Sequence, residues 1–322
     1  MLFFERIKKG VPEFLQQSKI VDLTYGGNSY YWMLDMLWCF IRYGARPIDY
    51  VRFQFHKKSS SERNRYLTIY RYFRVIKHFG AFKDGVNGKI AEYKTYAEYI
   101  HREWLVLDGN ISLAQLENFI NKHKVVIAKP VGGDQGKGVV KIECGNIARV
   151  LKLLEDSRKE PYIVEELIKN CDDIAAINPS SLNTVRVTTL ILRDGSTKIV
   201  SIILRVGRPN SHVDNWGAGG VGYNFDIETG ICNQYGKDKK NRPYVYHPGS
   251  NVQMIGYRLP RFEELKQYVL NLSKVYPAAR YVGWDVAITP NGFDLVEMNC
   301  PAGHDMFQSF DNPIYDLMRK NW

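Results

Sequence analysis

The sequence predicts an α+β protein in which a mainly helical, basic N-terminal region precedes two lobes of mixed strands and helices. Residues 1–82 contain apolar runs with helix start and stop signals, whereas short β-branched runs begin near residue 105. These runs and the helical stretches between them show no strict β-α alternation, which argues against one doubly wound sheet. We therefore expect a helical region over residues 1–82, a small lobe over 83–165 and a large lobe over 166–322.

Size and composition indicate an ordered globular protein. The chain has 322 residues, of which 45% are hydrophobic and 13% aromatic, enough for two or three lobes. Five scattered cysteines without a C-x-x-C pair support neither a disulfide framework nor a structural zinc site. The apolar run from Tyr30 to Ile41 contains Asp35 and is too short to span a bilayer, and the N-terminus lacks the pattern of a signal peptide. We expect a cytoplasmic protein, with association with the inner face of the membrane as an alternative.

The net charge of +10 comes largely from one segment. Residues 51–102 contain twelve Lys and Arg against four Asp and Glu. Such a segment attracts anions, which include nucleic acid, a membrane surface, nucleotide phosphates and acidic glycans. A solvated basic face without a partner is an equally good interpretation.

Three N-terminal stretches predict helices. In "NSYYWMLDMLWCFIRYG", Asn28 or Ser29 can cap a helix that Gly44 terminates. The stretch "SSSERNRYLTIYRYFRVIKHFG" has candidate caps at residues 59–61 and a stop at Gly80. "GKIAEYKTYAEYIHREWL" is the third predicted helix.

The strands of the two lobes are predicted from short β-branched runs bounded by turn-forming residues. These runs are "KVVIAKP", "GVVKI", "PYIVEELI", "TVRVTTLIL", "KIVSIILRVG" and "GFDLVEMN". The stretches "NIARVLKLLEDSRK" and "RFEELKQYVLNLSKVY" predict helices between them.

A glycine-rich stretch follows the first of these strands. Lys129 ends the strand, and "PVGGDQGKG" comes next. Glycines allow backbone amides to approach a phosphate closely, and the lysine adds a compact positive charge. The stretch is not a Walker A loop, because Gly138 rather than Ser or Thr follows Lys137. An ordinary glycine-rich hairpin is the alternative.

The stretch "YIVEELIKNCDD" places acidic residues at the end of a predicted strand. Glu165 and Glu166 end the strand, and Asp172 follows after a short loop. A carboxylate and backbone groups at a strand edge could contact the amino edge of adenine, and a nearby acid could bind ribose hydroxyls. Taken singly, acidic residues at a strand end more often face water.

Two arginines lie on predicted central strands. Arg186 and Arg205 are flanked by apolar residues, so each must find an anionic partner or reach solvent. Their planar guanidinium groups suit phosphate or carboxylate, and a structural ion pair is the alternative. The loop "NWGAGGVGYNFD" has four glycines in six positions from Gly217, which indicates close approach of its backbone to a ligand or a mobile surface lid.

The last motif along the sequence is a set of candidate oxygen ligands for a metal ion. Asp285 ends "YVGWD", whereas Glu297 and Asn299 end "FDLVEMN", and the turn signal "TPNG" between them predicts a hairpin. Glu297 and Asn299 are two apart on a strand and therefore project to the same face. Two carboxylates and an amide oxygen suit Mg²⁺, with Mn²⁺ as an alternative.

The order of these elements resembles the ATP-grasp superfamily over roughly residues 83–310. Its members hold ATP between two α+β lobes and usually join a carboxylate to an amine through an acyl phosphate. Asn215 followed by Gly219 and Gly220 looks like the N-x-x-x-G-G element of amino-acid-adding ligases of the ribosomal-protein-modifying type. The N-terminal stretches "IDYVRFQFHKKSSSERNRYLT" and "EYIHREWL" look like the sugar-transfer-associated branch found with capsule and surface-polysaccharide genes.

The resemblance implies a role for each of these residues. The lysines and the glycine-rich loop would bind the phosphates of ATP, the acids after the strand would contact adenine and ribose, and the arginines would steady the transferred phosphoryl group. The implied metal ligands are Asp285, Glu297 and Asn299, and the implied catalytic residues are Arg186, Arg205 and Asn215. The implied nucleotide-binding residues are Lys89, Lys129, Gly133, Gly136, Lys137, Gly138, Glu165, Glu166, Ile168, Asp172, Gly219 and Gly220.

The function implied by the resemblance is an ATP- and Mg²⁺-dependent carboxylate–amine ligase. The carboxylate would belong to a hexuronic acid or another glycan and the amine to an amino acid or amino sugar, in surface polysaccharide biosynthesis. The basic N-terminal region would suit a sugar nucleotide or a lipid-linked glycan, and we expect no nucleic-acid partner. His212 and His304 are expected near the site in structural or substrate-orienting roles. The alternatives are an ATP-dependent kinase on the same fold and a non-catalytic protein that binds nucleic acid or a membrane surface.

Overall fold

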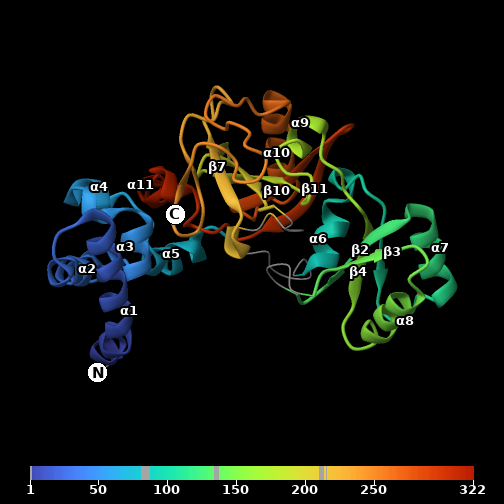
Figure 1. The fold of residues 1–322 in the computed structure, drawn as a ribbon, viewed down its shortest axis with the longest axis horizontal. Coiled ribbons are helices and arrows are strands. Elements are labelled where there is room, and N and C mark those ends of the chain that lie inside the picture. Colours follow the sequence, from blue (N-terminus) through green and yellow to red (C-terminus); the bar gives the residue numbers. More distant parts are fainter. Residues whose placement is uncertain (1, 81–87, 134–137, 210–213, 215) are drawn as a thin grey trace. The chain divides into compact units, whose positions relative to one another are not determined.

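The structure is a computed structural model, and it combines helices with two antiparallel sheets, as the sequence predicts (Figure 1). It describes residues 2–80, 88–133, 138–209, 214 and 216–322.

The chain forms two compact units, each built from segments that are distant in sequence. The helical unit consists of Met1–Gly80, Leu192–Ser196 and Pro301–Trp322, and the sheet unit of Ala81–Ile191 and Thr197–Cys300. We expected the C-terminal segment to continue the large lobe, but it packs in the helical unit because its side chains satisfy backbone groups there. The expected lobe boundaries at residues 82/83 and 165/166 stay predictions.

Helix α2 begins and ends where the sequence predicts. The Asn28 side chain accepts a hydrogen bond from the Tyr30 N–H at 2.8 Å, and Gly44 ends the helix with a φ of 64°. The Gly44 N–H donates to the Phe40 carbonyl at 3.0 Å. The helices of this unit are α1 (Leu2–Tyr25), α2 (Ser29–Tyr43), α3 (Pro47–Arg52), α4 (Ser60–Asn64), α5 (Ile69–Val75) and α11 (Tyr315–Asn321).

The single helix predicted to follow Ser59 is divided in the structure. Ser59 caps α4 as expected, since its hydroxyl accepts from the Glu62 N–H at 3.3 Å, but the helix ends at Asn64. Beyond it, the Leu67 N–H donates to Gln308 Oε1 at 2.8 Å, and Gln308 Nε2 donates to the Leu67 carbonyl at 2.9 Å. A buried side chain of the C-terminal segment thus takes the place of helical partners. Figure 1 accordingly shows α11 beside α4 and α5.

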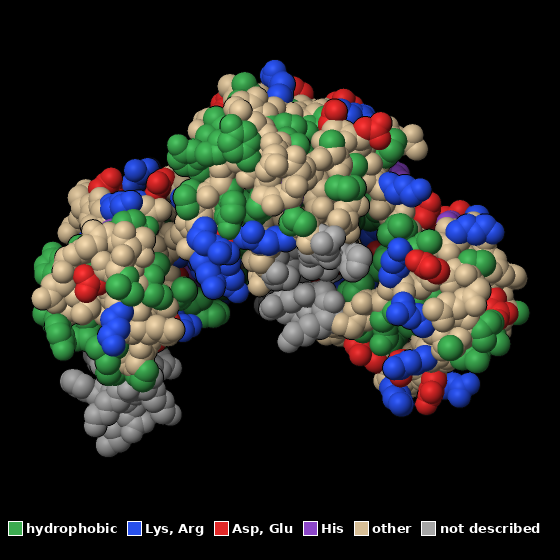
Figure 2. Space-filling view, viewed as in Figure 1, with side chains coloured by type: hydrophobic (Ala, Val, Ile, Leu, Met, Phe, Trp, Pro, Cys, Tyr) green, Lys and Arg blue, Asp and Glu red, His purple; other side chains and the backbone are tan. Residues whose placement is uncertain are grey.

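One face of α2 carries exposed apolar side chains. Tyr30, Leu34, Trp38 and Ile41 are each more than half exposed, and their spacing of three or four residues places them on the same side of the helix. Figure 2 shows hydrophobic side chains at the surface of this unit. Among the described residues, no helix is long and apolar enough to cross a membrane.

The sheet unit contains a four-stranded sheet with strand order β1-β4-β2-β3 and a seven-stranded sheet with order β11-β10-β5-β6-β7-β8-β9. Each run that was predicted as a strand forms one. The third predicted helix is shorter than expected, because α6 gives way to a turn and then to β1. The strands are β1 (Trp104–Leu107), β2 (Val125–Pro130), β3 (Val140–Glu143), β4 (Tyr162–Glu166), β5 (Thr184–Ile191), β6 (Thr197–Val206), β7 (Val221–Phe225), β8 (Gly236–Lys237), β9 (Pro243–Tyr244), β10 (Tyr281–Thr289) and β11 (Gly292–Asn299), and the helices are α6 (Lys89–Thr95), α7 (Leu113–His123), α8 (Ile147–Asp156), α9 (Asp172–Ala175) and α10 (Phe262–Val275).

Helices cover one face of each sheet. Helices α7 and α8 pack on the four-stranded sheet (Figure 1), and α10 packs on the seven-stranded sheet through buried residues such as Leu265 and Val269. Val185 and Val187 of β5 belong to the same core as α10. Because side chains alternate along a strand, Thr184 and Arg186 project to the opposite face of the seven-stranded sheet.

Candidate functional site

The face of the seven-stranded sheet opposite α10 gathers charged residues from four strands. Asp285 on β10 lies opposite Glu297 on β11 and opposite Arg186 on β5. Residues directly opposite each other in a sheet project to the same face. Arg205 on β6 lies opposite Thr184, two residues before Arg186, so it projects to this face as well. The strand register therefore joins residues that the sequence distributes over several motifs.

The predicted hairpin of β10 and β11 is present, but Asp285 does not end its strand. Thr289 pairs with Gly292 at the turn, and Asp285 lies in the middle of β10 beside a bulge that separates it from Val286. Asn299 Nδ2 donates to Asp285 Oδ2 at 3.4 Å. The strand continues past Asp285 because Val286 and the residues after it pack in the core.

The buried carboxylate of Asp285 is paired with two arginines. Arg186 contacts it through Nε and Nη2, the latter at 2.8 Å, and Arg205 Nη2 lies 3.0 Å from Oδ2. Burial alone would raise the pKa of Asp285, but the two guanidinium groups outweigh it and hold this pKa below its usual range. Both arginines thus form the ion pairs that were the alternative to a phosphoryl-binding role.

Glu297 differs from Asp285 in its electrostatic environment. Its side chain is open to solvent. Crowding by the surrounding protein and the negative charge of Asp285 nevertheless raise its pKa, and the positive charges of Arg186 and Lys129 offset part of that rise. Lys129 lies on the four-stranded sheet, and its charge lowers the pKa of Glu297 on the seven-stranded sheet.

The donor set on this face fits a hard divalent cation. Asp285, Glu297 and Asn299 offer only carboxylate and amide oxygens, and Mg²⁺ binds one or two carboxylates while it keeps waters and substrate phosphates as further ligands. In the part of the chain that the structure describes, no group of three or more His, Cys, Asp or Glu side chains is placed to hold a metal.

A buried ionic network connects the two sheets. Lys129 on β2 is ion-paired with Glu165 on β4, and Arg102 Nε donates to Glu165 at 2.7 Å while its Nη1 contacts Asp294 on β11. The Tyr93 hydroxyl donates to Glu165 at 2.5 Å. Burial would raise the pKa of Glu165, but Lys129 and Arg102 lower it to about 2. The carboxylate that we expected at adenine is thus engaged inside the protein, and Glu165 pairs with Trp104 on β1 and Ile127 on β2 within the sheet.

Lys89, the first residue of α6, lies against the glycine-rich loop. Its Nζ donates to the carbonyls of Pro130 at 2.8 Å and Gly133 at 2.5 Å. Lys89 therefore contacts the start of this loop, whereas the Lys129 ammonium group is paired with Glu165.

The glycines of the two predicted loops have local structural reasons. Gly138 and Gly219 have φ values of 76° and 103°, which favour glycine. A Cβ on Gly220 would lie 2.3 Å from the Asp214 carbonyl oxygen. These glycines are needed whether or not a ligand binds. Four predicted residues lie outside the described residues: Gly136, Lys137, His212 and Asn215.

The remaining predicted nucleotide contacts follow one another along the chain that leaves β4. The Glu166 N–H donates to the Glu103 carbonyl at 2.9 Å, Ile168 lies in the irregular segment after the strand, and Asp172 is exposed at the start of α9. Their adenine and ribose roles stay predictions. His304 belongs to the helical unit, where its ring stacks on Tyr72 with centroids 4.8 Å apart.

Sequence reasoning missed several buried residues of the site. Tyr93 and Arg102, the latter within "EYIHREWL", were not candidate site residues, and their partner Glu165 is more than sixty residues away. Glu92 accepts from the Met298 N–H at 2.5 Å, and burial together with the charge of Glu297 raises its pKa to about 8. One signal was present, because Glu92 follows Lys89 by three residues and so shares a helix face with it.

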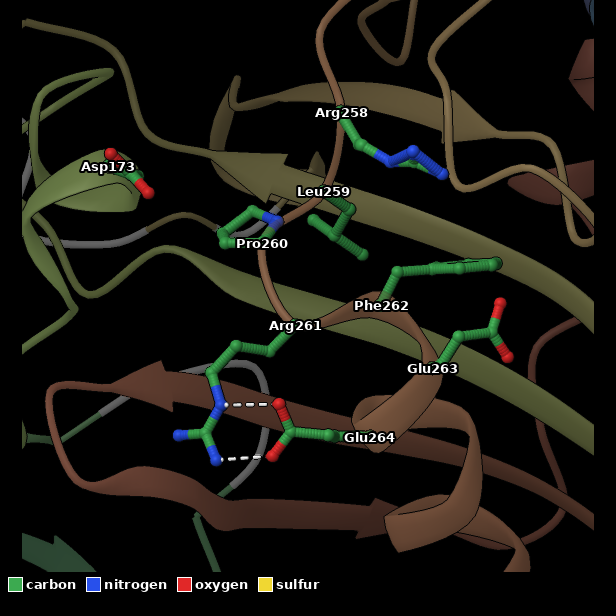
Figure 3. Close-up of a pocket in the computed structure, with 8 residues that line it drawn as sticks. All are labelled: Asp173, Arg258, Leu259, Pro260, Arg261, Phe262, Glu263 and Glu264. Atoms are coloured by element: carbon green, nitrogen blue, oxygen red, sulfur yellow. Dashed lines mark hydrogen bonds and ion pairs between the residues drawn. The ribbon is translucent and has the colours of Figure 1, made fainter.

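A separate hollow in the sheet unit contains none of the predicted site residues. Figure 3 shows this hollow, of about 400 Å³, lined by Asp173 and the segment Arg258–Glu264. Arg261 is tied up in it by Glu264, with two hydrogen bonds of 3.1 and 2.5 Å. The hollow is thus lined by charges of both signs, some of which pair with each other, so we do not regard it as a candidate site.

The acids, arginines and lysine-and-glycine loop around two antiparallel sheets define a protein of the ATP-grasp class. The family description "Sugar-transfer associated ATP-grasp" matches residues 93–312, more than half of the sequence. The chain belongs to this family, which confirms the predicted fold class and the resemblance.

Solved structures of ATP-grasp ligases resemble the chain only distantly. The N5-carboxyaminoimidazole synthetase of Staphylococcus aureus with ADP has a TM-score of 0.46 at 12% identity over 74% of this chain and 52% of its own. The D-alanine–D-alanine ligase of Bacillus anthracis has a TM-score of 0.44 at 13% identity over 73% of this chain and 66% of its own. The ligase PsnB with a minimal precursor, Mg and ADP has a TM-score of 0.41 at 15% identity over 71% of this chain and 57% of its own. The chain thus spans about half to two thirds of the length of these structures, and no curated protein matches it.

Proposed function

We propose that this protein is an ATP- and Mg²⁺-dependent carboxylate–amine ligase that acts through an acyl phosphate. The observation that carries the proposal is the row formed by Glu297, Asp285 and Arg186 across three neighbouring strands, with Arg205 beside it. This row combines two acids that could share a divalent cation with two guanidinium groups. Phosphoryl transfer from ATP depends on both kinds of charge.

The nucleotide would be held from the four-stranded sheet. Lys129 and Lys89 would contact its phosphates at the glycine-rich loop, and the chain that leaves β4 would contact adenine and ribose. Burial would lower the pKa of Lys129, but Glu165 raises it above the usual range, so the lysine keeps its charge. Asp285, Glu297 and Asn299 would hold Mg²⁺, which would neutralise charge on the phosphates.

The side chains of the site would contribute position and charge rather than a nucleophile. Arg186 and Arg205 would balance the negative charge that develops as an acceptor carboxylate takes the γ-phosphoryl group of ATP. That step gives ADP and an acyl phosphate, from which an amine displaces phosphate to form an amide. Asn215 with the loop at Gly219 and Gly220 would help to exclude water from the acyl phosphate.

We infer that the reaction belongs to surface polysaccharide biosynthesis. The family description links the chain to sugar transfer. The acceptor would be the carboxylate of a hexuronic acid, carried by a sugar nucleotide or a lipid-linked glycan, and the amine would come from an amino acid or an amino sugar.

The distribution of charge weighs against the nucleic-acid alternative. Within the basic segment 51–102, Arg52 is ion-paired with Asp305, and Arg63 with Asp35 at 2.7 Å. Part of the local excess is therefore neutralised by acids from other parts of the sequence. Figure 2 also shows positive and negative side chains interspersed on the surface around the four-stranded sheet.

The proposal is tested by measuring ADP release with Mg²⁺ for a panel of uronic acids, each against amino acids and amino sugars. The parent protein is compared with Glu297→Gln and with Glu155→Gln, a matched change at an exposed position of α8. We expect ADP and an amide for at least one pair in the parent and in Glu155→Gln, and a loss of about 100-fold or more in Glu297→Gln. A stable phosphorylated product without an amine would indicate the kinase alternative instead. Full activity in Glu297→Gln would overturn the proposed site.

A further inference from the structure

A cavity of about 500 Å³ in the helical unit has a strongly positive wall. It lies where the C-terminal end of α2 meets α5 and α11, and all of its lining residues belong to this unit. Four arginines line it, and no Asp or Glu among the described residues does so. These arginines are Arg42, Arg71, Arg74 and Arg319.

Arg71 is buried at the base of this cavity without a carboxylate partner. Its Nη1 donates to the carbonyls of Asn64 at 2.7 Å and Tyr66 at 3.0 Å, and its Nη2 donates to Asn64 Oδ1 at 2.8 Å. Its guanidinium carbon lies 4.2 Å from the centroid of the Tyr315 ring. These neutral contacts fix the orientation of the group but do not balance its charge.

The other buried arginines of the described chain are paired with acids. Arg52 contacts Asp305, and Arg102 contacts Glu165 as well as an aspartate. A buried charge without a counter-ion is costly, so the charge at Arg71 calls for an anion that the described protein does not supply.

The electrostatics at Arg71 agree with this geometry. Burial is the main cause that lowers the pKa of Arg71. Tyr315 and Tyr43 raise this pKa, and the positive charges of Arg74 and Arg42 lower it further.

We propose that this cavity is a binding site for a small molecule that carries a phosphate monoester or a diphosphate. Guanidinium forks match phosphate oxygens in pairs, and a phosphate group carries up to two negative charges near neutral pH, which suits several arginines better than a single carboxylate. A cavity of this size accommodates a small ligand. The residues of this cavity belong to the helical unit, whereas those of the proposed ligase site belong to the sheet unit.

Two sources could supply such a phosphate. Ile41 lines the cavity and also ends the exposed apolar stripe of α2, so a lipid with a phosphate headgroup shares the required chemistry with a soluble phosphate ester. The experiment therefore has a soluble arm and a vesicle arm.

In the soluble arm, calorimetric titration measures the affinity for inorganic pyrophosphate. The variant Arg74→Gln/Arg319→Gln removes two exposed arginines of the cavity, and Arg65→Gln/Lys77→Gln removes two exposed charges of the same unit outside it. We expect the cavity variant to bind about tenfold more weakly or worse, and the control to bind as the parent does. Any pyrophosphate bound in the sheet unit would be the same for both variants, so their difference reports on this cavity.

In the vesicle arm, the same variants are sedimented with phosphatidylcholine vesicles with and without phosphatidic acid. Binding that requires phosphatidic acid and is lost only in the cavity variant identifies a lipid source, and pyrophosphate binding alone identifies a soluble one. Equal pyrophosphate affinity in both double variants and the parent, or an equal loss in both, would overturn the site. If the double variant melts at a lower temperature than the parent, Arg319→Gln alone is used and has to show a smaller loss in the same direction. Loss of the site would leave the ligase proposal untouched, since that proposal is measured by ADP release.

Discussion

Asp285 and Glu297 lie opposite each other on neighbouring strands, yet the pKa of Asp285 is lowered and that of Glu297 is raised. Burial would raise both pKa values, but Arg186 and Arg205 contact Asp285 and outweigh burial there. At Glu297, burial and the negative charge of Asp285 outweigh the lowering influence of Arg186, Lys129 and Arg205. The negative charge of Asp285 is therefore balanced by the two arginines, whereas Glu297 has no arginine in direct contact among the described residues.

Replacing Asp285 with Asn should destabilise the protein strongly. The change leaves the half-buried Arg186 without its counter-ion and Arg205 with only Asp214, 3.5 Å away, for which we expect a loss of about 3–5 kcal/mol in the free energy of unfolding, measured with urea. Adding Arg186→Gln to Asp285→Asn should recover part of the loss, since the unpaired charge is then removed. An Asp285→Asn protein as stable as the parent would contradict the proposed role of this ion pair.

Glu165 should contribute stability that disappears in acid. Its pKa is lowered from 4.5 to about 2 in the folded state, so the unfolded chain binds the proton first as the pH falls. The contribution is present in full above the unfolded value and is lost between about pH 4.5 and 2. The difference in unfolding free energy between the parent and Glu165→Gln should accordingly narrow over this range. A difference that stays constant with pH would exclude an ionised Glu165 as the source.

Glu92 should have the opposite effect at higher pH. Its folded-state pKa of about 8 lies above its ordinary value of 4.5, so between these values the folded chain holds a proton that the unfolded chain has released. Stability then falls as the pH rises from about 4.5 to 8. In Glu92→Gln, whose amide oxygen can still accept from the Met298 N–H, this decline should be shallower than in the parent. Glu98→Gln, at an exposed position of the following turn, should leave the decline as it is.

Lys89 should affect nucleotide affinity more than stability. Its Nζ reaches two carbonyls at the start of the glycine-rich loop, so Lys89→Met should raise the KM for ATP about tenfold by removing a charged contact at the phosphates. The matched control is Lys94→Met, at an exposed position of the same helix. Equal KM values for ATP in the two variants would remove Lys89 from the proposed phosphate site.

Gly220→Ala should destabilise the fold without any ligand. A Cβ would approach the Asp214 carbonyl to 2.3 Å, so backbone must shift, at about 1–3 kcal/mol. The control is Gly303→Ala, whose Cβ would meet nothing closer than 3.7 Å. We expect it to change the free energy of unfolding by about 0.5 kcal/mol or less and to melt at nearly the same temperature as the parent. A neutral Gly220→Ala would mean that the loop adapts easily and that its glycines serve a ligand instead.

The strands and the central row of the site could be predicted because their signals are local. A period of two residues places Glu297 and Asn299 on one face, and the turn signal after Thr289 brings Asp285 beside them. That Arg186 stands next to Asp285 also follows from register, but the register of β5 against β10 depends on the whole core and not on either strand alone.

The buried network and the helix break could not be predicted from local signals. Arg102 contacts acids 63 and 192 residues away, and nothing near it in the sequence marks those partners. Leu67 leaves the helical pattern because of Gln308, 241 residues further along the chain. Long-range hydrogen bonds of this kind override local propensity, and a single sequence does not reveal them.

The partnership of Leu67 with Gln308 also sets an order of events during synthesis. Residues 1–80 are synthesised before the segment Pro301–Trp322, which belongs to the same unit. Until then, the backbone of Leu67 lacks its acceptor and donor, and the sheet unit, whose segments lie between, can assemble first. The two hydrogen bonds that shape the chain between α4 and α5 can therefore form only after Gln308 has been synthesised.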